Sequence, residues 1–322
     1  MSKDPLKPLH VAAAVLRDSA GRVLLARRHD HLHQGGLWEF PGGKLEADET
    51  VAEGLARELR EELGIEVVRC RPFLCIDHAY PELTVRLDVH EVLEWRGEPR
   101  PLEGQALRWA DPRSLDPGDF PAADIPMLTA LRLPARYVIS DEPASAAVFL
   151  DTLDRCLARG ERLIQLRAKR MHQNELGLLT SEAATRCARL GAELLVNAAP
   201  EQARDWGAHG VHLSSDRLMQ LASRPLPSGC LVAASCHDAR ELAHAREIGV
   251  DFVVLSPLRS TASHSEATPL GWTGFTSLAR RANLPVYALG GVSPDDLDAV
   301  REARGFGVAG IGAFWPKSEG SE

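Results

Sequence analysis

Eight short apolar runs recur through the second half of this 322-residue sequence, with helical segments between them. Strands that are buried on both faces of a parallel sheet have this continuous apolar character, and each needs a crossover helix to reach the next. Helices are predicted at residues 145–158, 175–190, 239–248 and 294–303. The pattern predicts a (β/α)8 (TIM) barrel with its ligand site at the carboxyl ends of the strands, and an open doubly wound sheet is the alternative. The predicted strands are Tyr137–Ile139, Leu163–Leu166, Leu194–Val196, Val211–Leu213, Leu231–Ala234, Phe252–Leu255, Val286–Leu289 and Val308–Ile311.

The first half of the sequence has a mixed pattern in which strands outnumber helices. Two predicted strands flank the turn Asp18–Gly21 and are expected to form a hairpin, and one strong helix is predicted over Val51–Leu63. Pro134 disfavours a helix through Arg132–Arg136, so we place the domain boundary there. This gives domains of 1–133 and 134–322, in keeping with roughly 150 residues per domain. The predicted strands of the first domain are Val11–Leu16, Val23–Ala26, Thr84–Leu93 and Gln105–Ala110.

The charge balance restricts the partners of this chain. The formal net charge is −8, and an acidic surface repels the phosphate backbone of a nucleic acid. We therefore expect no nucleic acid polymer as a partner. A small nucleotide remains compatible, because a divalent metal held by carboxylates reverses the local sign of the charge.

The cysteines and the amino-terminal residues indicate the compartment. The six cysteines include no C-x-x-C pair and are widely spaced, which argues against a zinc or disulfide framework. Charges and prolines occupy the first residues, where a signal peptide needs an apolar stretch, and no window reaches the roughly 18 to 20 apolar residues of a spanning helix. We expect a cytoplasmic protein with reduced thiols and no membrane partner. The sequence predicts no oligomeric state.

The predicted helix Val51–Leu63 has defined ends and one apolar face. Thr50 followed by Glu53 has the spacing of a capping box, and Gly64 supplies a left-handed stop residue. An apolar stripe repeats every four residues and can pack on a sheet. The stripe consists of Val51, Leu55, Leu59 and Leu63, and Ala52 and Ala56 widen it.

Three carboxylates project from an adjoining face of this helix. Glu58 and Glu62 lie one turn apart, and Glu61 is three residues from Glu58. Because Mg²⁺ prefers carboxylate and phosphate oxygens, the cluster can hold a metal and diphosphate complex. The alternative is a solvated acidic face supported by ion pairs of Arg57.

The spacing from Gly43 to Ile65 resembles the Nudix hydrolase box at every defined position. It has a glycine, a glutamate after five residues, and an Arg-Glu pair after seven more. An aliphatic residue, one residue and a Glu-Glu pair follow, and then one residue, a glycine and an aliphatic residue. The resemblance implies an α/β/α sandwich with a mixed sheet, and attack of water on a nucleoside diphosphate derivative. In that chemistry, catalysis is mainly positioning and charge neutralisation by metal.

The resemblance also implies the roles of individual residues in the box. Mg²⁺ is the implied metal, with Mn²⁺ as an alternative. The metal-binding glutamates would be Glu58, Glu61 and Glu62, oriented by Arg57 with help from Glu49.

Further segments resemble the MutT branch of this family over about Leu9 to Leu133. They include residues 37–46, 95–99, 103–105 and 120–126. The resemblance implies hydrolysis of 8-oxo-dGTP to the monophosphate and pyrophosphate, which removes an oxidised nucleotide from the precursor pool and avoids mutation during DNA replication. The implied nucleotide-binding residues are Arg28, His33, Glu39, Phe40, Pro41 and Gly42; the Gly42 carbonyl would ligate metal, and Glu103 would be a further ligand or base.

One position departs from the MutT pattern. MutT proteins have an asparagine where this chain has Asp124. An ionised aspartate only accepts hydrogen bonds, so it cannot donate to guanine O6. A buried, protonated Asp124 would recover the donor, because desolvation raises a carboxyl pKa. On that condition we expect preference for 8-oxo-guanine nucleotides.

The second domain resembles the thiamine phosphate synthase/TenI family from about Ala135 to Trp315. The matches lie after successive predicted strands, at residues 165–169, 197, 210–213, 235–237, 256–257 and 290–291. The last two loops of such barrels commonly bind phosphate. The implied phosphate-binding residues are Arg167, Lys169, Asn197, Gly290 and Gly291, together with the backbone around Ile311 and Gly312.

The second domain departs from the synthase pattern where Mg²⁺ would bind. The synthase has an Asn-Asp pair after the third strand and an acidic pair after the fourth, but the matching positions here are Ala198 and Asp216-Arg217. The family lysine after the sixth strand aligns with His264. Without an intact metal site, pyrophosphate release loses its main charge stabiliser, so full synthase activity is not expected.

Several functions remain open at this point. The barrel could be a TenI-like thiazole phosphate isomerase with His264 or His237 as proton carrier, a module that binds a thiazole or pyrimidine phosphate, or a fold kept for stability. The first domain could hydrolyse another nucleoside diphosphate derivative or a thiamine-pathway pyrophosphate. The non-enzymatic alternative is a ligand-responsive binding protein whose carboxylate helix holds a metal.

Overall fold

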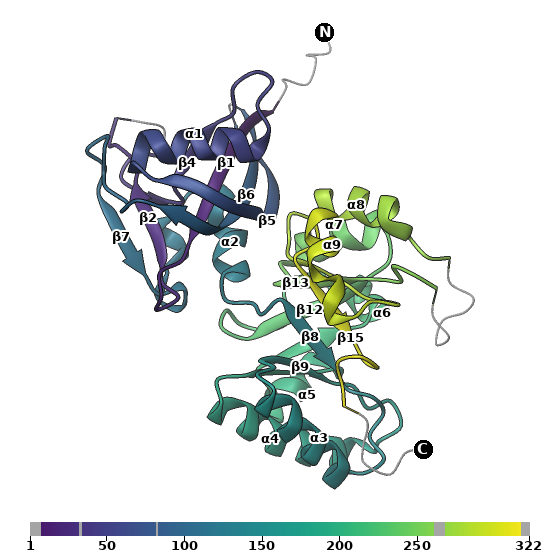
Figure 1. The fold of residues 1–322 in the computed structure, drawn as a ribbon. Helices are drawn as coiled ribbons and strands as arrows, with labels where there is room; N and C mark the ends of the chain where they lie inside the picture. The colour runs from purple at the N-terminus through teal and green to yellow at the C-terminus, as the bar shows by residue number, and fades with distance from the viewer. Residues whose placement is uncertain (1–7, 32–33, 82, 261–267, 317–322) are drawn as a thin grey trace. The chain divides into compact units, whose positions relative to one another are not determined.

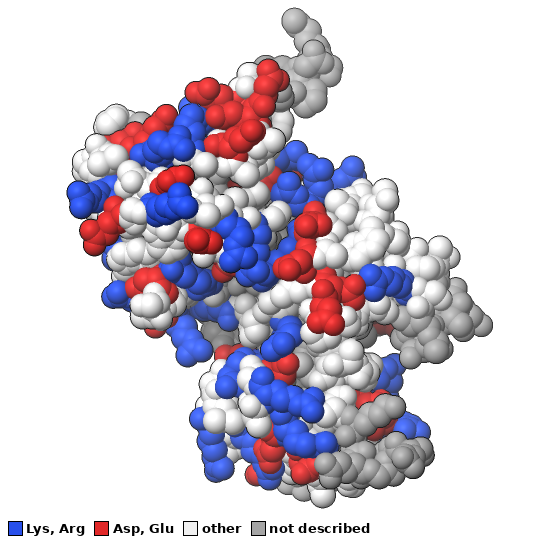
Figure 2. All heavy atoms as spheres, in the orientation of Figure 1, with Lys and Arg blue, Asp and Glu red and all other residues white. Residues whose placement is uncertain are grey.

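The computed structural model describes residues 8–31, 34–81, 83–260 and 268–316. The chain divides into two compact units, Met1–Arg132 and Leu133–Glu322, and each is described by itself (Figure 1). Within the described ranges, no helix is long and apolar enough to cross a membrane. On the face shown in Figure 2, basic and acidic side chains are interspersed over both units.

The first unit contains one mixed sheet and one smaller antiparallel sheet. The mixed sheet has the order β4-β1-β6-β5, in which β1 and β6 run parallel and the other pairs run antiparallel. The smaller sheet has the order β3-β2-β7. The strands are β1 (Leu9–Leu16), β2 (Val23–Arg27), β3 (Trp38–Glu39), β4 (Gly42–Lys44), β5 (Glu66–Ala79), β6 (Thr84–Arg96) and β7 (Leu107–Ala110).

Helix α1 (Val51–Leu63) lies against the mixed sheet (Figure 1), and its apolar stripe packs on that sheet. Leu55, Leu59 and Leu63 are fully buried with residues of β1. The sequence-predicted bounds of this helix are confirmed. A short helix α2 (Ile125–Ala130) and three 3₁₀ turns at Pro112–Ser114, Pro117–Asp119 and Ala122–Asp124 complete the unit.

The prediction that β1 and β2 pair as a hairpin is wrong. The turn forms, because the Gly21 amide donates to the Asp18 carbonyl at 2.9 Å, but only the bridge between Arg17 and Val23 joins the two segments. β1 pairs with β4 and β6, whereas β2 pairs with β3 and β7. Both strands contain runs of consecutive buried residues, so each lies between two neighbours inside its own sheet.

The second unit is a closed barrel of eight parallel strands, which confirms the predicted fold class and excludes the open sheet. The strands follow one another in chain order around the barrel. They are β8 (Arg136–Ile139), β9 (Leu163–Leu166), β10 (Glu193–Val196), β11 (Gly210–Leu213), β12 (Leu231–Cys236), β13 (Phe252–Leu255), β14 (Val286–Ala288) and β15 (Gly307–Gly310).

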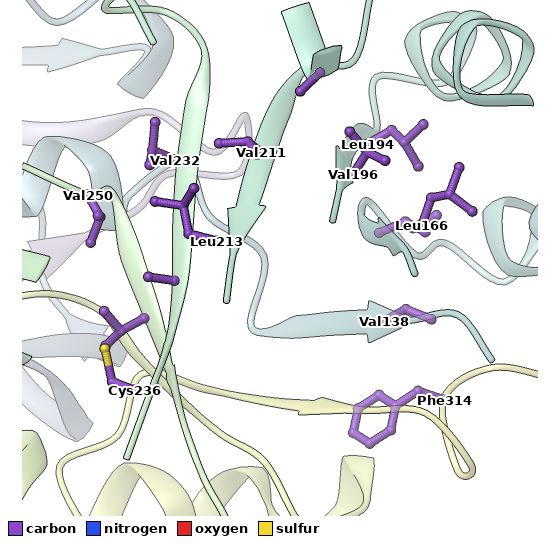
Figure 3. Packing of buried hydrophobic residues seen from close by; sticks show 14 of the residues in the cluster. Val138, Leu166, Leu194, Val196, Val211, Leu213, Val232, Cys236, Val250 and Phe314 are labelled. Carbon is purple, nitrogen blue, oxygen red and sulfur yellow. The ribbon is translucent and has the colours of Figure 1, made fainter. Parts of the chain in front are cut away.

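Helices surround these strands (Figure 1). Figure 3 shows the core between the two layers, where Val138, Leu166, Val196 and Val211 belong to one buried cluster. The helices are α3 (Ala146–Ala158), α4 (Gln173–Arg189), α5 (Pro200–Asp205), α6 (Ser215–Gln220), α7 (Ala239–Ile248), α8 (Gly271–Ala282) and α9 (Leu297–Glu302), and a 3₁₀ turn at Pro294–Asp296 precedes α9.

Aromatic side chains close the amino-terminal end of the barrel interior. The rings of Tyr137, Phe252 and Tyr287 lie with their centroids 5.1 to 5.9 Å apart, and all three side chains are fully buried. Each comes from the first or second residue of its strand. Because this end is filled, a ligand has access only from the carboxyl ends of the strands.

Candidate functional site

Local hydrogen bonds fix both ends of α1 and so position its carboxylates. The Thr50 hydroxyl accepts from the Glu53 amide at 3.3 Å, and the Glu53 carboxylate accepts from the Thr50 amide at 2.9 Å. Gly64 adopts the left-handed conformation with φ 68° and donates to the Arg60 carbonyl. The helix therefore begins and ends where the capping residues require.

Arg57 gathers three of the box carboxylates. Its guanidinium donates to both oxygens of Glu49, at 2.8 and 3.0 Å, and this pairing lowers the pKa of Glu49 to about 2. It also donates to Glu58 at 2.9 Å and to Glu61 at 3.3 Å. The bidentate pair anchors Arg57 to the preceding loop, so the same guanidinium can orient Glu58 and Glu61.

Glu62 lies at the buried side of this cluster. One carboxylate oxygen accepts from the Gly42 amide at 3.2 Å. Burial, together with the negative charges of Glu39, Glu103 and Glu58, raises the pKa of Glu62 to about 8. Glu62 is thus surrounded by carboxylates that repel its negative charge, which is the electrostatic condition under which a cation binds favourably.

The two glycines before the helix permit close approach of the loop. A Cβ at Gly42, where φ is +145°, would lie 2.1 Å from the Ala12 carbonyl oxygen. A Cβ at Gly43 would lie 2.3 Å from the Glu58 carboxyl carbon. Only a residue without a side chain leaves this space beside Glu58.

A cavity of about 440 Å³ joins the end of the carboxylate helix to the residues of the expected nucleotide pocket. Its lining includes Glu62 and Gly42 as well as Arg28, Glu39 and Asp124. The lining also includes Phe40, Gln34, Gly43, Lys44, Tyr80, Pro121, Ala123 and strand residues of β1 and β6.

The cavity walls are held by specific contacts. Arg28 forms an ion pair with Glu39. Phe40 is buried, and its ring stacks on Phe120 with centroids 6.1 Å apart. The Pro41 carbonyl accepts from the Ala14 amide at 2.8 Å, so Pro41 holds the loop to β1.

Asp124 is buried, as it must be if a protonated aspartate is to replace the asparagine of the MutT pattern. It is 6% exposed, on the 3₁₀ turn before α2. Burial and, to a lesser extent, the Glu39 charge raise its pKa to about 8 against the opposing charge of Arg28. At neutral pH the carboxyl is therefore mainly protonated, and it can both donate and accept a hydrogen bond.

Asp124→Asn is expected to stabilise the protein increasingly as pH rises. Unfolded Asp124 ionises from about its usual pKa of 3.8, whereas the folded carboxyl stays neutral until about pH 8. Folding stability is therefore lost between these values, by up to about 1.4 kcal/mol per pH unit. Denaturant unfolding at pH 5 and pH 7 should show that the stability difference between variant and wild type grows by at least about 1 kcal/mol.

The control for this comparison is Asp119→Asn, which changes an exposed carboxylate of the neighbouring 3₁₀ turn. Its stability difference from wild type should be similar at the two pH values. An Asp124→Asn difference that does not change between pH 5 and pH 7 would show that Asp124 is ionised in the folded protein.

Two further residues, Glu103 and His33, were predicted for the site of the first unit. Glu103 is exposed, its amide donates to the Gln105 side chain at 3.0 Å, and its charge acts on Glu62. His33 lies outside the described residues. With the side chains as they stand, no group of three histidine, cysteine or acidic residues in the described ranges is arranged to hold a metal ion. Arg57 contacts both Glu58 and Glu61 in this arrangement.

In the second unit, Glu142 fixes the loop that carries the predicted Arg167 and Lys169. Its carboxylate accepts from the Lys169 amide at 3.0 Å and from the Arg170 amide at 2.9 Å. The Arg167 amide donates to the Ser140 hydroxyl at 2.9 Å. The sequence analysis missed Glu142, although it lies only three residues after the first barrel strand, because a lone loop carboxylate carries no spacing signal.

Asn197 and Arg217 meet at the carboxyl ends of neighbouring strands. A guanidinium nitrogen of Arg217 lies 3.2 Å from the Asn197 side-chain oxygen. Ala198 is buried, and Asp216 is exposed in the first turn of α6. The structure thus brings Arg217 to the predicted phosphate-binding Asn197, a contact that the sequence analysis did not predict.

The other predicted barrel residues surround the same end. Gly290 and Gly291 have φ of +100° and +66°, and a Cβ at Gly290 would lie 3.0 Å from Pro257. The His237 ring nitrogen Nδ1 lies 2.8 Å from the Ser256 carbonyl, which favours the tautomer protonated at Nδ1. His264 lies outside the described residues.

The sequence analysis also missed a row of hydrogen-bonded polar side chains inside the barrel. The His212 ring lies between the Tyr137 hydroxyl, at 3.1 Å, and the Ser235 hydroxyl, at 2.8 Å. Burial and, to a lesser extent, the Arg167 charge lower the pKa of His212 to about 3. The third position of each short strand could have signalled an inward-facing side chain at His212 and Gln165.

Known protein families match both units. The NUDIX domain model matches residues 12–130, and the thiamine monophosphate synthase model, TMP-TENI, matches residues 136–314. The chain therefore belongs to the Nudix family in its first unit and to the thiamine monophosphate synthase/TenI family in its second.

Individual relatives resemble one unit each. An 8-oxo-dGTP diphosphatase of Proteus vulgaris is 45% identical over 92 residues, which cover 29% of this chain and 82% of the relative. A CTP pyrophosphohydrolase of Escherichia coli is 38% identical over 125 residues, covering 39% and 92%. The "Putative thiamine-phosphate synthase 2" of Aquifex aeolicus is 33% identical over 184 residues, covering 57% and 99%.

Proposed function

We propose that the first unit is a Mg²⁺-dependent pyrophosphohydrolase that converts 8-oxo-dGTP to 8-oxo-dGMP and pyrophosphate. The observation that carries this proposal is that one cavity is lined both by Glu62 and Gly42 of the carboxylate cluster and by Arg28, Glu39 and Asp124. A nucleotide placed there has its phosphates near the carboxylate helix and its base near Asp124.

The chemistry of the donors supports a divalent metal at α1. The side chains are hard oxygen ligands, the carboxylates around Glu62 oppose its ionisation, and Gly43 leaves space beside Glu58 that a Cβ would fill. The proposed ligands are Glu58, Glu61, Glu62, Glu103 and the Gly42 carbonyl. A bound Mg²⁺, or Mn²⁺ in its place, would neutralise triphosphate charge and lower the pKa of a water molecule.

The residues of the chain position the reactants. Arg57 holds Glu58 and Glu61 beside the phosphates, and Glu103 can take the proton of the attacking water. The water oxygen forms a bond to phosphorus as the bridge between the α- and β-phosphates breaks. The products are a monophosphate and pyrophosphate, and one proton is released.

The neutral Asp124 carboxyl provides a physical basis for base preference. Its hydroxyl can donate to O6 of 8-oxo-guanine while its carbonyl accepts from N7–H. In guanine, N7 is an acceptor, so the same carbonyl would face an acceptor. An unsatisfied polar contact of this kind costs about 1 to 3 kcal/mol, or about 10- to 100-fold in kcat/KM.

Cytosine is the second base class that this carboxyl fits. A protonated Asp124 can donate to a ring nitrogen and accept from the exocyclic amino group of cytosine. The similarity to a CTP pyrophosphohydrolase makes this the main competing substrate class.

A substrate panel tests the proposal. Full-length protein with Mg²⁺ is assayed for pyrophosphate release from 8-oxo-dGTP, dGTP, CTP and dCTP. We expect kcat/KM for 8-oxo-dGTP to exceed that for dGTP by at least about 10-fold. Equal kcat/KM for dGTP and 8-oxo-dGTP would refute the preference, and a higher value for CTP or dCTP would assign the site to cytosine nucleotides.

A further inference from the structure

Among the described residues, the positions that match the metal ligands of the synthase do not provide a set of ligands for a divalent metal. Mg²⁺ prefers several carboxylate or phosphate oxygens at once. Ala198 contributes no oxygen from its side chain, and Asp216 is exposed at the start of α6. The Asn197 amide oxygen already accepts from Arg217 at 3.2 Å. The residues present therefore do not fit the Mg²⁺ site that the synthase resemblance implies.

A guanidinium occupies this position instead. β10 lies between β9 and β11, and Asn197 directly follows β10, so Arg217 reaches across from the connection after β11. Arg217 is half-buried, and its hydrogen bond to Asn197 fixes one of its nitrogens. Since a guanidinium has five N–H donors, it retains donors for an anion.

Further positive charge lies on the neighbouring strand connection. Arg167 directly follows β9, and its amide donates to the Ser140 hydroxyl at 2.9 Å, which fixes its backbone at the carboxyl end of the barrel. Lys169 lies on the same connection, whose backbone is held by Glu142. Glu142 carries an opposing negative charge, but both of its oxygens already accept from backbone amides, and the side chains of Arg217, Arg167 and Lys169 together favour a phosphate group over a divalent cation.

We infer that the barrel binds a small phosphorylated molecule without a divalent metal, with the guanidinium of Arg217 supplying the charge that a metal would otherwise provide. The anion would contact Arg217 at the carboxyl end of the barrel, the end where Arg167 and the glycine-rich turn at Gly290 and Gly291 also lie. This inference is independent of the function proposed for the first unit.

Isothermal titration of the full-length protein with inorganic pyrophosphate tests this inference. Titrations in EDTA remove the contribution of metal in both units. We expect wild-type protein to bind pyrophosphate in EDTA, and Arg217→Gln to weaken binding at least about tenfold, because a charge-assisted hydrogen bond contributes about 1.5 to 3 kcal/mol. Arg217→Lys should give an intermediate affinity, since it retains the charge but not the planar donors.

Two further variants test whether the change in pyrophosphate binding is specific to the position of Arg217. Arg246→Gln removes an exposed arginine in the last turn of α7 and should leave binding unchanged. The double variant Ala198→Asp/Arg217→Asp should not bind pyrophosphate in EDTA. Added Mg²⁺ should increase its affinity for pyrophosphate more than it increases that of the wild type. The inference is overturned if wild-type protein binds no pyrophosphate in EDTA, or if Arg217→Gln binds it as tightly as wild type.

Discussion

Glu58→Gln is expected to lower kcat for pyrophosphate release about 100-fold or more while KM changes only a few-fold. Glutamine has nearly the same shape, so the hydrogen bond from Arg57 at 2.9 Å can persist through the amide oxygen. The change removes a negative charge proposed to hold the metal at the phosphates. Because that charge stabilises the transition state more than it stabilises the bound substrate, its removal lowers kcat more than it changes KM.

Steady-state kinetics on 8-oxo-dGTP at saturating Mg²⁺ provide the measurement for Glu58→Gln. Glu94→Gln is the matched control, because Glu94 is an exposed glutamate on β6 away from the cavity lining. The control should retain wild-type kinetics. If Glu58→Gln turned over at near the wild-type rate, Glu58 could not be a metal ligand in the reaction.

Gly43→Ala is expected to lower kcat about tenfold or more with little effect on stability. The new Cβ would lie 2.3 Å from the carboxyl carbon of Glu58, so the end of that side chain must move. Gly43 does not have a positive φ, and its backbone can therefore accept an alanine. The displaced group is the end of a flexible side chain, which is why activity should suffer more than folding.

A double-mutant cycle distinguishes this displacement from general damage. If Gly43→Ala acts through Glu58, it should have little further effect on kcat in the Glu58→Gln background. Gly274→Ala in α8 is the control, because its nearest contact would be at an ordinary 3.6 Å. Losses that multiply in the double variant, or an unchanged kcat in Gly43→Ala, would contradict the proposed role of the loop.

Short-range signals explain why α1 could be predicted residue by residue. The capping box at Thr50 and Glu53 and the left-handed Gly64 are local features, and the structure contains both. The barrel strands were likewise predictable, because each is a mainly apolar run that is buried over most of its length.

Long-range pairing explains what the sequence did not reveal in the first unit. β5, over Glu66–Ala79, was missed because its alternation is interrupted by Pro72 and by register shifts against β6. β1 and β2 adjoin one turn but belong to different sheets. Such choices depend on partners distant in sequence, which local patterns do not identify.

The candidate sites of the two units likewise differ in how far the sequence could predict them. The box carboxylates share one helix, so spacing alone places them together. Asn197 and Arg217 are 20 residues apart and meet only because β10 and β11 are neighbours in the barrel. The burial that raises the pKa of Asp124 likewise arises from tertiary packing.

The most direct test of the central claim is the product and metal requirement of full-length protein acting on 8-oxo-dGTP. We predict one pyrophosphate for each 8-oxo-dGMP formed with Mg²⁺, no turnover in EDTA, and recovery when Mg²⁺ is restored. Release of inorganic phosphate without pyrophosphate, or an equal rate in EDTA, would contradict the assignment of a metal-dependent pyrophosphohydrolase to the first unit.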